Sequence, residues 1–170
     1  MRFWRTDGYV AAFLLIGLVG CSSQPESPPD SSGGSEYLLT AEPSGAQEVV
    51  QAISDAGADE EVVVVGRIGG EVNPWVEGLA AFSIVDRKLK ACSDVEGDNC
   101  STPWDYCCEA DLAKSKTLVE IVDGNGSTVK ADARQLLKLK ELQTVVVKGK
   151  AARDEANNLT VLATGVYVMH

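Results

Sequence analysis

Four of the five cysteines in this chain lie within one short stretch, CSDVEGDNCSTPWDYCC, which spans residues 92–108. Clustered thiols can bind a thiophilic metal, carry out redox exchange, or cross-link a loop through disulfides. The spacing here is C-x7-C-x6-C-C, whereas structural zinc sites usually pair their ligands as C-x2–4-C. No C-x-x-C redox motif is present, and the only histidine is His170, at the end of the sequence. The spacing by itself therefore favours neither a standard zinc site nor thioredoxin-like chemistry.

The N-terminal residues indicate where these thiols reside. Arg2 and Arg5 precede an apolar run over 10–18 that is too short to span a bilayer and has the form of a secretory signal. The segment that follows, Leu18-Val19-Gly20-Cys21, resembles the lipobox of bacterial lipoproteins. The resemblance implies cleavage before Cys21 and a lipid anchor on its thiol. Several acyl chains on one residue make a stable membrane anchor.

We therefore expect an extracytoplasmic, membrane-anchored lipoprotein of the bacterial cell envelope. Ser22 follows the lipid-bearing cysteine. In a cell with two membranes, the lipoprotein resemblance then implies the outer membrane, with the protein facing the periplasm.

This location favours disulfides, because thiols tend to oxidise outside the cytosol. If Cys21 carries the lipid, an even number of cysteines remains: Cys92, Cys100, Cys107 and Cys108. We expect two disulfides, in which one member of the adjacent pair bridges to Cys92 and the other to Cys100, in either order. A zinc or copper site at the four thiolates and a labile redox pair remain alternatives.

Large aromatic residues near the cysteines are candidate ligand-binding groups. Trp104, Asp105 and Tyr106 lie inside the cysteine-rich stretch, and Trp75 lies in an earlier loop. The rings could stack on a sugar or a peptide while the carboxylate accepts hydrogen bonds. In the alternative reading, the same rings only cover the disulfides or pack in the core.

The composition divides the chain into a leader, a tether and one domain. We assign a signal peptide to 1–20, a lipid-anchored disordered tether rich in Ser, Pro and Gly to 21–43, and a short amphipathic helix to 44–58. The domain over 59–170 contains a disulfide-rich loop at 91–110. Ser44 is the expected N-cap of the helix.

The domain alternates β-branched runs with turns. Strands are predicted over 60–70, 78–87, 116–123, 144–151 and 158–169, and a helix over 131–142. The first and fourth strands share the pattern V-x-V-x-G, in which the glycine marks a bend. This order resembles the OB-fold, so we expect an all-β, five-stranded Greek-key barrel with one or two short helices and a cysteine-rich insertion between strands 2 and 3. The resemblance implies binding of oligonucleotides or oligosaccharides, although one fold hosts many functions.

The charge of the chain reduces the number of functional classes that the fold allows. The net charge is −10, and loss of the leader with Arg2, Arg5 and Asp7 leaves 13 basic and 24 acidic residues, a net charge of −11. An acidic surface disfavours nucleic acid, whose binding depends on Lys and Arg contacts to phosphate. No Walker sequence is present, and the lone terminal histidine argues against Ser-His-Asp and Cys-His catalysis. We expect a non-catalytic binding module whose partners are the membrane, through its lipid, and an envelope protein, a peptide or a saccharide.

Overall fold

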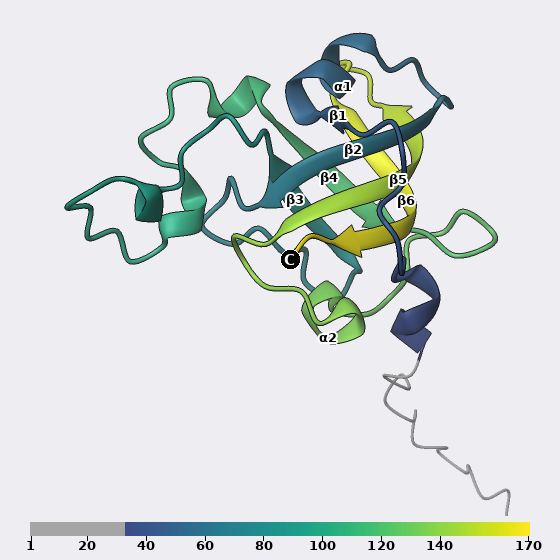
Figure 1. Cartoon of the computed structure of the whole chain (residues 1–170). Coiled ribbons are helices and arrows are strands. Elements are labelled where there is room, and N and C mark those ends of the chain that lie inside the picture. Colours follow the sequence, from purple (N-terminus) through teal and green to yellow (C-terminus); the bar gives the residue numbers. More distant parts are fainter. Residues whose placement is uncertain (1–32) are drawn as a thin grey trace, which may run out of the picture.

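The computed structural model describes residues 33–170, and these form one closed β-barrel (Figure 1). Its strands are β2 (Glu61–Ile68), β3 (Ala81–Val85), β4 (Lys116–Ile121), β5 (Thr144–Arg153) and β6 (Leu159–Val168). β2, β3 and β4 form an antiparallel meander, and β6 runs parallel to β4. β5 pairs antiparallel with both β6 and β2 and closes the barrel. This is the strand order of an OB-fold-like barrel, so the predicted all-β fold class is confirmed.

Short elements cover the barrel. β1 (Gln47–Glu48) pairs parallel with β2 and leads directly into α1 (Val49–Asp55), and α2 (Ala133–Leu137) lies between β4 and β5. Residues 33–170 also contain four 3-10 helices: η1 (Gly33–Tyr37), η2 (Cys92–Asp94), η3 (Pro103–Asp105) and η4 (Leu112–Lys114). No helix within residues 33–170 is both long and apolar enough to cross a bilayer.

The V-x-V-x-G strands build the core of the barrel. Val62 and Val64 of β2, together with Val145 and Val147 of β5, are all buried in one apolar cluster. Alternation along each strand places both members of a pair on the same face, and β-branched side chains fit this pleated interior. Both strands therefore direct these valine pairs into the barrel core.

Gly149 provides the sharp bend in β5. The register between β5 and β6 shifts between Lys148 and Gly149, as in a β-bulge. A Cβ atom added at Gly149 would lie 2.0 Å from the backbone oxygen of Leu162. The two strands can approach this closely only because position 149 has no side chain.

Both predicted helices are shorter in the structure. The helix assigned to 44–58 covers only Val49–Asp55, and Glu48 rather than Ser44 is its N-cap residue, because the preceding residues pair with β2 instead. The helix assigned to 131–142 ends at Leu137, where Lys138 turns into the left-handed region with a φ of 56°. Its N-terminus is capped by Asp132, which accepts hydrogen bonds from two backbone N–H groups.

The assignment of 21–43 to a disordered tether is wrong from Gly33 onwards. Tyr37 and Leu38 pack against the barrel core, and the backbone N–H of Leu39 donates to Val166 of β6 at 2.8 Å. These apolar residues interrupt the polar segment, and burial of their side chains stabilises its packing on the barrel. The signal peptide, the lipobox with Cys21, and residues 21–32 of the tether lie outside the described residues.

The bend at Gly149 can be tested with a pair of alanine substitutions. Gly149→Ala pushes a methyl group into the backbone of β6, so we expect the free energy of unfolding to fall by about 2 kcal/mol or more. Gly124→Ala is the control, because a Cβ at Gly124 would meet nothing within 4 Å. Denaturant unfolding of both variants measures the difference, and equal stabilities would contradict the close approach.

Candidate functional site

The cysteine loop, residues 91–110 between β3 and β4, carries the residues singled out by the sequence. Figure 1 shows it extending from one side of the barrel, well apart from α2. Tyr106 attaches it: the side chain is 0% exposed and packs with Val85 of β3 and Ala91. Leu89, Leu112 and Leu142 surround this group, which forms a second apolar cluster beside the main core. The loop is therefore held to the barrel by a small core of its own.

The glycines that follow β2 make room for this contact. The backbone N–H of Gly70 donates to the carbonyl oxygen of Trp104 at 2.8 Å. A Cβ at Gly69 would lie 2.5 Å from that oxygen and 2.9 Å from the ring of Tyr106. The chain after β2 can thus lie directly against the loop.

An ion pair adds a second attachment. The Nη1 group of Arg67, in β2, donates to Asp94 Oδ2 at 2.5 Å, and its Nε donates to the carbonyl oxygen of Leu142 at 3.0 Å. The hydrogen bond from Arg67 holds the pKa of Asp94 below its ordinary value. Because both side chains are partly exposed, this pair orients the loop more than it stabilises it.

Three thiols and one carboxylate converge within the loop, and we call these residues the thiol–carboxylate cluster. The Sγ atom of Cys92 lies 3.6 Å from Sγ of Cys107 and 3.7 Å from Oδ1 of Asp105. The cluster contains four ligand atoms that all lie within 4.8 Å of one another, one each from Cys92, Cys100, Asp105 and Cys107. The sequence separation of 15 residues between the outermost members hides this proximity.

Besides the Cys92 thiol, two closer donors hold the carboxylate of Asp105 in place. The backbone N–H of Cys107 donates to Oδ1, and the hydroxyl of Thr102 donates to Oδ2, both at 2.9 Å. Burial by itself would raise the pKa of Asp105, but these hydrogen bonds lower it below the ordinary value. The side chain is thus an ionised carboxylate that faces the thiols.

The backbone at Tyr106 shapes the cluster. Tyr106 ends η3 in the left-handed region with a φ of 56°, which is unusual for a large side chain. This conformation reverses the chain between Asp105 and Cys107, so that both contribute to the cluster while the ring of Tyr106 packs in the second apolar cluster beside the main core. Burial of the ring holds the strained backbone in place, and it also raises the pKa of the hydroxyl to about 12.

Two thiols of the cluster have pKa values above the ordinary one. Burial raises the pKa of Cys92, and hydrogen bonding with Cys92 and Cys108 raises the pKa of Cys107.

The disulfides predicted from the sequence are not formed in the structure. No bond joins any two of the four described cysteines, and the 3.6 Å between Cys92 and Cys107 exceeds the S–S bond length of about 2.05 Å. The loop is held instead by Tyr106 and by the hydrogen bonds of Asp105, which leave the sulfur atoms in contact. Cys108 is exposed and lies outside the cluster, near Cys92 and Asp98.

Two of the candidate ligand-binding aromatics are buried. Trp75 is 5% exposed; its ring packs on Phe82, with centroids 5.8 Å apart, and its Nε1 donates to Glu141 at 2.6 Å. Tyr106 is fully enclosed. Both residues therefore take the structural role that the sequence left open, and neither can stack on a ligand.

The remaining two candidates are partly accessible. Trp104 is half-buried, and its Nε1 donates to the carbonyl oxygen of Val72 at 3.0 Å, so it connects the loop to the β2–β3 connection. Asp105 is also half-buried and belongs to the thiol–carboxylate cluster. Sequence reasoning missed Arg67, Gly69 and Thr102, whose roles depend on contacts between distant segments.

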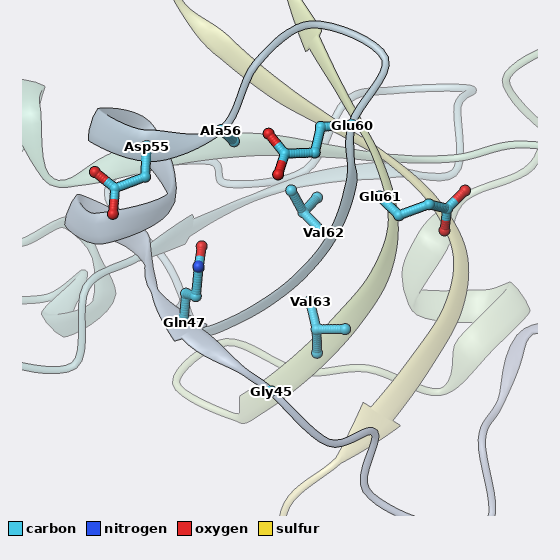
Figure 2. A pocket seen from close by; sticks show the side chains of 8 residues that line it. All are labelled: Gly45, Gln47, Asp55, Ala56, Glu60, Glu61, Val62 and Val63. Carbon is cyan, nitrogen blue, oxygen red and sulfur yellow. The ribbon is translucent and has the colours of Figure 1, made fainter.

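A surface hollow on another part of the barrel has different chemistry. Figure 2 shows it between α1, β1 and the start of β2, with Asp55, Glu60 and Glu61 among its lining residues. Glu60 accepts a hydrogen bond from the backbone N–H of Gly57 at 2.8 Å, and in Figure 2 the carboxylates of Asp55 and Glu61 point away from each other. The carboxylates do not converge, so the hollow offers no assembled site.

No protein-family model matches this sequence, and no curated protein matches it significantly.

The attachment of the loop can be tested at Tyr106. Tyr106→Ala removes the whole buried ring, so we expect a loss of about 3–5 kcal/mol in the free energy of unfolding, with earlier proteolytic cleavage inside residues 91–110. Tyr106→Phe is the matched control. Among the described residues no group pairs with the Tyr106 hydroxyl, so its removal should leave the stability unchanged or raise it by about 1 kcal/mol. A destabilised Tyr106→Phe variant would show that the hydroxyl has a partner.

Proposed function

We propose that this protein is a lipid-anchored, extracytoplasmic OB-fold module that binds a ligand without catalysing a reaction, and that the cysteine loop is its binding region. The observation that carries this proposal is the thiol–carboxylate cluster, which is assembled at a fixed place on the barrel. Such a cluster can hold a ligand through several donors at once.

The net charge of the chain and the burial of Trp75 support a function other than nucleic-acid binding. OB-folds that bind single strands combine basic grooves with exposed stacking aromatics. Here the chain carries a net charge of −10, and Trp75, on the connection after β2, is buried. The half-exposed Trp104 is the residue on which an envelope protein, a peptide or a saccharide would dock as a further partner.

The lipobox supports the location of the module. Cys21 lies 12 residues before η1, the first element within the described residues 33–170. Even a fully extended segment of that length spans only about 40 Å. An anchor at Cys21 would therefore keep the barrel close to the membrane surface, facing the periplasm in a cell with two membranes.

Substitution of the anchor residue tests the location. We expect the wild-type chain to incorporate labelled palmitate and to sediment with membranes, and Cys21→Ala to lose both properties. Cys108→Ser is the control, because it removes an exposed thiol without touching the lipobox. Membrane association of an unlabelled Cys21→Ala chain would contradict the anchor.

A further inference from the structure

We propose that the thiol–carboxylate cluster is a tetrahedral site for one thiophilic divalent cation of the zinc class, with Cys92, Cys100, Asp105 and Cys107 as its ligands. This inference names the ligand of the module proposed above. It rests on that proposal only in treating the cysteine loop as the binding region.

The spacing of the donors is the first argument. Zinc binds thiolate sulfur at about 2.3 Å, which places two sulfur ligands of one tetrahedral ion roughly 3.8 Å apart. Cys92 and Cys107 lie 3.6 Å apart, and Cys92 lies 3.7 Å from Asp105 Oδ1. These two pairs thus already stand at the separation of ligands that share an ion, and all four donors lie within 4.8 Å of one another. A disulfide would require the two sulfur atoms to approach by about 1.5 Å more.

The supporting contacts are the second argument. Ligand carboxylates in metal sites are usually oriented by further hydrogen bonds. Thr102 and the backbone N–H of Cys107 donate to the two oxygens of Asp105, and the buried ring of Tyr106 fixes the backbone between Asp105 and Cys107. The site is therefore held in shape by the barrel and does not depend on the ion alone.

Exposure and donor type define which ion fits. Cys92 is buried at the inner side of the cluster, Cys100 and Asp105 are half-buried, and Cys107 is exposed, so an ion can enter from solvent. Three thiolates and one carboxylate suit a borderline-soft, four-coordinate ion. Calcium and magnesium, which take six or more oxygen ligands, do not match this set.

A second group of donors provides the controls. Cys92, Asp98 and Cys108 also lie within 4.8 Å of one another, but this group has only three members, and Asp98 and Cys108 are exposed. Asp98 Oδ1 is moreover engaged by the backbone N–H of Cys100 at 2.6 Å. The four-donor cluster is the more complete site, so Asp98 and Cys108 should be dispensable for binding.

The test uses the full-length chain, purified in detergent without chelator or reductant. We expect one zinc ion per chain by elemental analysis. After removal of the zinc, Co²⁺ should give the visible bands of tetrahedral coordination together with thiolate-to-metal charge transfer. Asp105→Asn and Cys107→Ser should weaken zinc binding at least 10-fold, since even loss of an outer contact costs about that much. Asp98→Asn and Cys108→Ser should leave the affinity unchanged.

Folding of the variants is checked independently. Asp105→Asn preserves the shape of the side chain and an acceptor for the N–H of Cys107, so its circular dichroism should match the wild type. Added zinc should raise the unfolding temperature of the wild-type chain and not that of Asp105→Asn, because only a folded chain with an intact site gains from binding.

Three results would overturn the inference. The first is a denatured chain with no titratable thiols, which would mean two disulfides, and the second is a metal-free chain that does not bind zinc. The third is a zinc affinity that falls in Cys108→Ser or Asp98→Asn as much as in Asp105→Asn. Membrane release of Cys21→Ala is measured separately, so failure of the metal site and failure of the anchored module are distinguishable.

Discussion

The burial of one side chain, Tyr106, determines whether the cysteine loop has a structure. The loop is polar and has few other apolar residues with which to pack, so its order depends on this ring and on Val85 and Ala91 beneath it. A fully buried aromatic side chain contributes several kcal/mol through the hydrophobic effect and dispersion. That energy also supports the left-handed backbone at Tyr106, which brings Asp105 and Cys107 to the same cluster.

The barrel provides the surface against which the cysteine loop packs. Its closure through β2 and β5 fixes where β2 ends, and the two glycines after β2 form the surface on which Tyr106 and Trp104 rest. Arg67, one residue before the end of β2, reaches both Asp94 and the residue that precedes β5 by two positions. An ion at the thiol–carboxylate cluster would then join Cys100 to the segments at Cys92 and at Asp105–Cys107, which are already attached to the barrel. Binding would therefore order little additional chain and cost little conformational entropy.

The barrel was predictable from the sequence, whereas the site was predictable only in part. β-branched runs, the V-x-V-x-G repeat and the strand order gave the fold, because inward and outward positions alternate along each strand. The clustered cysteines correctly located an insertion between the second and third barrel strands, which are β3 and β4 in the structure. It did not reveal that Cys92, Cys100 and Cys107 meet with Asp105, because this depends on how Tyr106 packs against Gly69 and Val85 across the fold. Nor did it reveal the burial of Trp75, which depends on packing against Phe82 in the main core. The prediction of a disordered tether failed from Gly33 onwards for a similar reason. Tyr37 and Leu38 pack on a core surface that exists only once the barrel has formed.

Amide hydrogen exchange resolved by residue tests most directly whether the cysteine loop is a fixed part of the barrel. The decisive probe is the N–H of Gly70, which donates across to Trp104 of the loop. If the loop is docked as described, this amide exchanges as slowly as its neighbours in β2, because both open only with the barrel. Exchange of Gly70 at the rate of an unstructured peptide, while β2 stays protected, would contradict the docked loop and with it the assembled site.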